Sequence, residues 1–215
     1  EEEKVAMLEK AYANLAEGRK NFPDDVSILF AEINHFLRIN KLDVLIEKLE
    51  TAIEKEPDNI SLYTTMGNVY DNLYQVAAGE GNEENSTKYF NKALEYYNQA
   101  LTKDPGFTDA TYSIGALYFN QAAQMTQELS TLADDFSKEG QRKYDALQAE
   151  VGEVFETALP YFVEVEKKKP NDINTLIALK EIYARKSDYT MSNEFKARLE
   201  KVQAGEAVES YFMKN

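Results

Sequence analysis

Few side chains in this sequence could perform chemistry. The chain of 215 residues contains a single histidine, His35, and no cysteine, which excludes thiol chemistry, disulfides and a zinc ion held by several imidazoles. A Ser-His-Asp arrangement could use only His35. Because His35 lies between Asn34 and Phe36 in a helical pattern, we interpret it as a packing residue, buried or between repeats, and not as a catalytic group.

Carboxylates are abundant, with 38 acidic against 24 basic residues and a net charge of −14. Adjacent acids such as Asp134–Asp135 and Glu83–Glu84 could act as a glycosidase pair or bind a cation. In so acidic a chain, however, no pair stands out, and the spacing of an EF-hand is missing. A nucleic-acid partner would need a basic face. We therefore predict a non-enzymatic protein without cofactor or metal, and no nucleic-acid partner.

Four prolines divide the chain into helical segments. Pro23, Pro57, Pro105 and Pro170 each follow one helical pattern and precede another, at separations of 34, 48 and 65 residues. A proline in this setting marks the end of one helix and the start of the next. A period of 34 residues is typical of a unit of two helices, and the second and third separations exceed it by 14 and 31 residues.

The segments after the prolines share a residue pattern. The first helical segments carry an apolar residue, Gly and Tyr in the same order, at Met66, Gly67 and Tyr70 and again at Ile114, Gly115 and Tyr118, and Tyr63 and Thr111 stand at the equivalent position one turn earlier. The second segments carry Ala, an aromatic residue and a small apolar residue, at Ala93, Tyr97 and Ala100 and at Ala158, Phe162 and Val165. This pattern resembles the tetratricopeptide repeat family, in particular bacterial members with extended-helix insertions. The resemblance implies an all-α fold, a right-handed α-solenoid of antiparallel helix pairs.

We expect one repeat array over residues 1–215. It comprises a half repeat at 1–23, repeats at about 26–59, 60–107, 108–172 and 173–203, and a tail at 203–215. The half repeat has the pattern of a second helix without its first, so we expect either a truncated array or a capping helix. Ile33 and Lys180 depart from the family by standing where it prefers Gly.

Pairs of apolar residues predict how the helices of each repeat face one another. In an antiparallel pair the numbers of facing residues have a constant sum. Tyr63 with Ala100 and Met66 with Tyr97 place one turn near Gly81–Asn82. A longer series, from Ile114 with Phe162 to Leu132 with Tyr144, places the next turn near Lys138 within 137–140. The 31 additional residues therefore extend both helices into a projecting hairpin, 116–156, for which a flexible polar insert is the alternative. In the first repeat, Glu32 falls at a packing position.

The resemblance also implies a binding surface, because the family binds peptides or helices in a groove lined by the first helix of each repeat. The corresponding residues are Phe30, Asn34, Leu37, Arg38, Thr64, Asn68, Asp71, Asn72, Tyr112, Phe119, Asn120, Glu181 and Arg185. Asparagine side chains there could bond a peptide backbone through both donor and acceptor, and solvated helix positions are the alternative. A carboxylate clamp for a chaperone tail is disfavoured, since the required cations are missing. The expected partner is a protein or peptide of basic or mixed charge.

Two other functions remain open. The 116–156 hairpin could mediate homo-oligomerisation, or the chain could be an accessory of an exported glycan-handling system in which Tyr112 and Phe119 stack on sugar rings.

The sequence contains no run of about 18 apolar residues, so we expect no membrane span. The first residue is Glu1, and the lack of an initial Met and of Cys favours an exported or periplasmic location over a cytoplasmic one.

Overall fold

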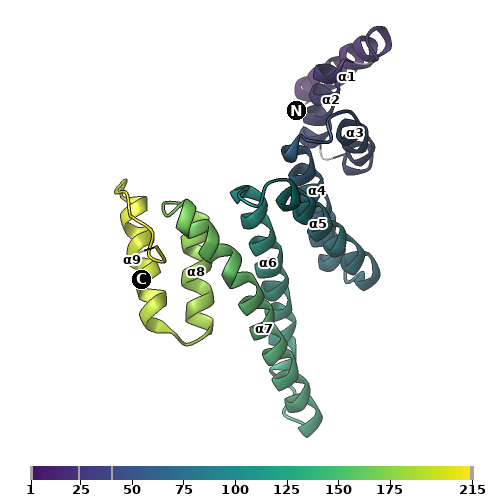
Figure 1. Cartoon of the computed structure of the whole chain (residues 1–215). Helices are drawn as coiled ribbons and strands as arrows, with labels where there is room; N and C mark the ends of the chain where they lie inside the picture. Colours follow the sequence, from purple (N-terminus) through teal and green to yellow (C-terminus); the bar gives the residue numbers. More distant parts are fainter. Residues whose placement is uncertain (1, 24, 40, 214–215) are drawn as a thin grey trace. The chain divides into compact units, whose positions relative to one another are not determined.

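A computed structural model describes residues 2–23, 25–39 and 41–213. The side chains of residues 2–6, 26, 37, 38 and 43 also lie outside the described part. Within that part all regular structure is α-helical, and the chain forms two compact units, Glu1–Asp104 and Pro105–Asn215 (Figure 1). Unit 1 contains α1 (Glu2–Asn21), α2 (Val26–Arg38), α3 (Leu42–Lys55), α4 (Ile60–Gly79) and α5 (Glu83–Lys103). Unit 2 contains α6 (Thr108–Leu132), α7 (Lys138–Lys168), α8 (Ile173–Arg185) and α9 (Tyr189–Gln203). None of the described helices combines the length and apolar character needed to cross a membrane.

The core of unit 1 joins α2, α3 and α4. Leu29, Leu45, Leu49 and Met66 are fully buried there. Glu32 is also buried, at 2% exposure, as the pairing in the sequence implies. Two cations offset this buried charge, because Glu32 Oε2 lies 3.8 Å from Arg19 Nε on α1 and 3.4 Å from Lys48 Nζ on α3. The acid therefore links three helices electrostatically, although no described group donates a hydrogen bond to its Oε2 atom.

The helices α4 and α5 pack closely because Gly67 has no side chain. A Cβ atom at this position would overlap the ring of Tyr97, which is fully buried. The turn between the two helices lies at 80–82, with Gly81 at a φ of 70° and the Asn82 side chain accepting from the Asn85 backbone N–H. Glycine adopts that backbone conformation without strain. The turn predicted near Gly81–Asn82 is thus confirmed.

Unit 2 contains the elongated hairpin. Helix α6 has 25 residues and α7 has 31, and they run side by side as one pair (Figure 1). The prediction that the additional residues extend both helices is confirmed, and the flexible insert is excluded. The predicted position of the turn is wrong by a few residues: it lies at 133–137, because Ser137 caps α7 by accepting from the Gly140 N–H and so starts the helix at Lys138.

The core of unit 2 lies where α6 and α7 meet α8 and α9. Phe162, Leu176, Leu179, Ile182 and Phe195 are among its fully buried side chains. Gly115 on α6 lies at a related but looser contact with α7, because a Cβ atom there would lie 3.1 Å from Tyr161 Cβ and 3.3 Å from the Phe162 ring. Both central repeats thus use a small-against-aromatic contact, while Ile33 and Lys180 replace the glycine in the outer ones.

The expected tail folds back onto unit 2. The carboxylate of Glu166 on α7, fully buried, accepts from the Ser210 hydroxyl at 2.6 Å and the Tyr211 N–H at 2.6 Å. Arg198 on α9 lies 3.7 Å from the same carboxylate. The rings of Tyr211 and Phe212 pack against Phe195. Residues 208–213 therefore close the end of the unit 2 core.

Two side chains hold the backbone of this tail. Asn171 donates to the Val208 carbonyl at 3.3 Å and accepts from the Val208 N–H at 2.7 Å, as a neighbouring β-strand would. Arg198 donates to the Glu209 carbonyl at 2.6 Å. The tail is consequently fixed by polar contacts to its backbone as well as by its aromatic rings.

Substitution of Gly67 tests the helix contact in unit 1. We expect Gly67→Ala to lower the free energy of unfolding by about 1–3 kcal/mol, because the buried Tyr97 ring must move to admit the methyl group. The exposed Gly152 in α7 has open space around it, so Gly152→Ala should instead raise stability by about 0.5–1 kcal/mol. Urea denaturation followed by circular dichroism measures both. Equal effects of the two substitutions would contradict the close contact.

Substitution of Glu166 tests the docking of the tail. Glu166→Ala should cost about 2–3 kcal/mol, because it removes a charged acceptor for buried donors. It should also speed chymotrypsin cleavage at Tyr211 and Phe212. Glu164→Ala, an exposed change on the same helix, should remain within about 0.5 kcal/mol. Unchanged cleavage in Glu166→Ala would show that the tail does not depend on this carboxylate.

Candidate functional site

On α2 of unit 1, the predicted groove residues differ in their surroundings. Asn34 is exposed, whereas Phe30 is half-buried and packs against the unit 1 core. The side chains of Leu37 and Arg38 lie outside the described residues. Among the predicted groove residues of α2, Asn34 is the one whose described side chain is polar and exposed, so it is the hydrogen-bonding position of this set.

Helix α4 carries four predicted groove residues. Thr64 is buried and donates to the Ile60 carbonyl at 3.1 Å, so its side chain is not open to a partner. Asn72 is exposed. Asn68 is exposed as well, and its Oδ1 accepts from the Tyr97 hydroxyl at 2.8 Å. That bond fixes the orientation of the amide, whose nitrogen has no partner within the described residues and so remains a donor toward solvent.

Asp71, one turn after Asn68, is half-buried and accepts from Gln75 Nε2 at 3.0 Å. Burial raises the pKa of the Asp71 carboxyl above its ordinary value of 3.8, against the lowering effect of the Gln75 hydrogen bond. The charged form is therefore less well solvated at this position than in water.

In unit 2, two aromatic groove residues of α6 pack against α7. Phe119 makes edge contacts with Phe155 and Phe162, with ring centroids 5.3 and 6.1 Å apart, and belongs to the core more than to the surface. Tyr112 meets Phe162 edge to face at 5.8 Å and remains half-buried, as does Asn120. The edge contact packs the Tyr112 ring against α7.

On α8, Glu181 and Arg185 form an ion pair at 3.1 Å. The Arg185 guanidinium also lies 4.7 Å from the centre of the Phe155 ring, a cation–π contact with α7. One turn before Glu181, the apolar side chain of Ile177 is 40% exposed. On α8, the charges of Glu181 and Arg185 thus neutralise each other, while Ile177 is an exposed apolar residue.

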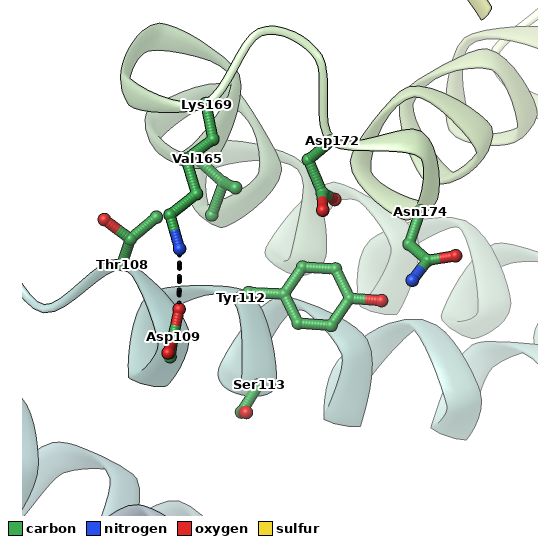
Figure 2. A pocket seen from close by; sticks show the side chains of 8 residues that line it. All are labelled: Thr108, Asp109, Tyr112, Ser113, Val165, Lys169, Asp172 and Asn174. Atoms are coloured by element: carbon green, nitrogen blue, oxygen red, sulfur yellow. Dashed lines mark hydrogen bonds and ion pairs between the residues drawn. The ribbon is translucent and has the colours of Figure 1, made fainter. Parts of the chain in front are cut away.

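A pocket lies at the start of α6 and α8, where both approach the end of α7 (Figure 2). It has a volume of about 170 Å³ and is lined by Thr108, Asp109, Tyr112, Ser113, Val165, Lys169, Asp172 and Asn174. Lys169 Nζ lies 2.7 Å from Asp109 Oδ1. Figure 2 shows the Tyr112 ring beneath Asp172, with its hydroxyl end directed toward Asn174.

Asp172 has two roles at this pocket. Its Oδ1 accepts from the Thr175 N–H at 2.8 Å and the Thr175 hydroxyl at 2.6 Å, so it caps α8. Its negative charge also acts on Tyr112, because burial and then the Asp172 carboxylate raise the pKa of the Tyr112 phenol. The carboxylate and the ring therefore share one electrostatic environment.

Sequence reasoning found Tyr112 but missed Lys169, Asp172 and Asn174. These three residues come from the connection around Pro170 and the first turn of α8, and not from the face of a first helix. A signal was present, since an Asp that follows a helix-ending proline and precedes an apolar run is typical of a helix cap.

A second pocket of about 480 Å³ lies in unit 1, between α1, α2 and α3. His35 lines it together with Tyr12 and Phe36. The imidazole is only 8% exposed and stacks on Tyr12 with ring centroids 5.4 Å apart. The buried, packed position expected for His35 is confirmed by these contacts. No three or more acids or histidines are grouped to hold a metal ion in the part of the chain that the structure describes, this pocket included.

The raised pKa of Asp71 generates a pH prediction. The folded state keeps the Asp71 proton to higher pH than the unfolded state, so its contribution to stability falls as pH rises from 3.8 through the raised value. Asp71→Asn does not lose stability in this way, because the asparagine amide does not ionise. We expect the variant to gain stability over the wild type as pH increases from below 3.8 to neutral, measured by urea denaturation at each pH. Glu80→Gln, at an exposed position beyond the same helix, serves as the control. A stability difference independent of pH would contradict the prediction.

No family model matches the sequence, and no curated protein is similar to it. Solved structures do match. MamA MSR-1 C2 is 15% identical, with a TM-score of 0.51 over 95% of this chain and 91% of its own. TTC0263, a thermophilic tetratricopeptide repeat protein of Thermus thermophilus, is 15% identical with a TM-score of 0.46 over 91% and 92%. A tetratricopeptide repeat protein from Parabacteroides merdae is 18% identical with a TM-score of 0.46 over 95% and 76%. The match to MamA and the helix pairs described above show that this chain has the tetratricopeptide repeat fold.

Proposed function

We propose that this protein is a non-enzymatic scaffold that binds a protein or peptide on the first helices of unit 2. The observation that carries the proposal is the placement of the unit 2 pocket beside Ile177, an apolar side chain that is 40% exposed on α8. Asn174 lines the pocket and lies one turn before Ile177 on the same helix. A polar recess and an apolar contact thus adjoin.

Such a surface suits a peptide better than a small substrate. Specificity in peptide recognition comes from separate pockets for individual side chains, while a neighbouring apolar contact supplies affinity. Tyr112 and Asn174 provide hydrogen-bonding groups in the recess, and Ile177 provides the apolar contact. The net charge of −14 favours a partner of basic or mixed charge.

The test is a peptide library displayed on phage and selected against the full chain. We expect the selected peptides to bind Ile177→Glu about tenfold more weakly than the wild type, because the charge replaces an apolar contact. Tyr189→Glu is the matched control, an acid placed at a 65% exposed aromatic residue on α9, a second helix. It should leave the affinity unchanged. Equal affinity of the two variants for the selected peptides would contradict the proposal.

Self-association through the hairpin is a second candidate, favoured by one residue. Phe136 lies in the turn between α6 and α7 and is 89% exposed. An aromatic ring in this position loses water contact only if another molecule covers it. The hairpin of unit 2 would then present its tip to a second copy of the chain.

Light scattering over a concentration series tests this candidate. If Phe136 mediates association, Phe136→Ser should abolish a mass above that of the monomer. Phe22→Ser, at a ring that is 63% exposed outside the hairpin, should not. A monomeric wild type at every concentration would exclude the candidate.

A further inference from the structure

The unit 2 pocket has the size of a site for one side chain. Its volume of about 170 Å³ is below the roughly 300–1,000 Å³ of pockets that hold small-molecule ligands. Asp109 and Lys169 at its edge have side chains 65% and 52% exposed, so the pocket opens to solvent. An occupant can therefore enter as the end of a side chain of a longer molecule.

The charges of the pocket leave one carboxylate without a cation. Lys169 neutralises Asp109 through their contact at 2.7 Å. Asp172 receives hydrogen bonds only from the neutral groups of Thr175, and within the described residues no cation pairs with it. The pocket thus carries a net negative charge beside Tyr112.

The N-termini of two helices at the pocket do not make it an anion site. Helix N-termini attract anions, and α6 and α8 both begin here. The protein supplies those anions itself, because Asp172 caps α8 and Asp109 lies in the first turn of α6. An incoming anion would have to share the pocket with both carboxylates.

Tyr112 provides the second element of recognition. Its ring is fixed against Phe162 and lies next to Asp172 (Figure 2). Aromatic rings attract cations, and the guanidinium of arginine stacks on them more often than the ammonium of lysine. The Asn174 amide lines the same pocket and carries both a donor and an acceptor. Carboxylate, ring and amide together match a planar group with several donors.

We propose that this pocket binds the guanidinium of an arginine in a partner peptide, with an apolar residue of that peptide on Ile177. The inference rests on the proposed peptide-binding function and names the residue class that the site selects. Asp172 is the charge partner and Tyr112 the stacking surface. Arginine-containing peptides are therefore the expected ligands.

The experiment titrates the isotope-labelled full chain with blocked tripeptides, up to their solubility limit, by NMR. The probes are Ala-Arg-Leu, its citrulline analogue of equal shape and no charge, and Ala-Glu-Leu. We expect Ala-Arg-Leu to shift the amide signals of Tyr112 and Asn174. The citrulline peptide should bind about tenfold more weakly, because it lacks charge-assisted hydrogen bonds.

The protein offers a matched pair of variants. Asp172→Asn removes the charge but keeps an oxygen that caps α8, since Asn and Asp cap helices equally well. This variant should bind the arginine peptide about tenfold more weakly than the wild type. Asp188→Asn makes the same change at the cap of α9, where Asp188 accepts from the Met191 N–H, and should leave affinity unchanged. Circular dichroism checks that both variants fold.

Three results would overturn the inference: no signal shift at Tyr112 with the arginine peptide, tighter binding of the glutamate peptide, or equal affinity in Asp172→Asn. The proposed function fails separately. Library-selected peptides could bind Ile177→Glu more weakly and yet contain no arginine and bind Asp172→Asn as tightly as the wild type. The protein would then bind peptides, but this pocket would not bind arginine.

Discussion

The structure depends on the close approach of paired helices, which a glycine on one helix and an aromatic ring on the other make possible. Gly67 receives the Tyr97 ring, and Gly115 receives the Phe162 ring. With no Cβ in the way, the ring fills the space between the backbones and excludes water. The buried rings also contact the candidate binding residues: the Tyr97 hydroxyl orients Asn68, and the Phe162 ring packs against Tyr112. The core contact thereby sets the geometry of the candidate binding residues.

The pairing of the helices was predictable because the positions of the prolines and the spacing of the apolar residues indicated the same helix pairs. Prolines marked the connections, and facing apolar residues fixed the register of α4 with α5 and of α6 with α7. The turn at 133–137 was misplaced since apolar periodicity ends near Leu132 and the boundary depends on a serine cap. The docked tail could not be predicted, because the Glu166 contacts join residues 44 to 46 positions apart without any periodic pattern.

The candidate site was predictable only in part. The position of a residue in a helix gives the face that it occupies but not how close the next element comes, so the burial of Thr64 and the partial burial of Phe119 could not be predicted. Asn34 and Asn72 are exposed, as their positions imply. The polar pocket needed the connection at 169–172, whose place depends on how α7 ends against α6 and α8. Sequence periodicity carries no information on such a meeting of three elements.

The elongated hairpin of α6 and α7 has a consequence for how its length can change. Buried residues form the seam between the two arms, from Ala122 and Phe155 near the core to Leu129 near the turn. Lengthening one arm alone would rotate its apolar seam by about 100° per added residue. Insertions and deletions are therefore tolerated only in matched steps of whole helical turns on both arms. Among related chains, hairpin length should vary in discrete increments, and the tip should move outward while the repeat beneath it stays the same.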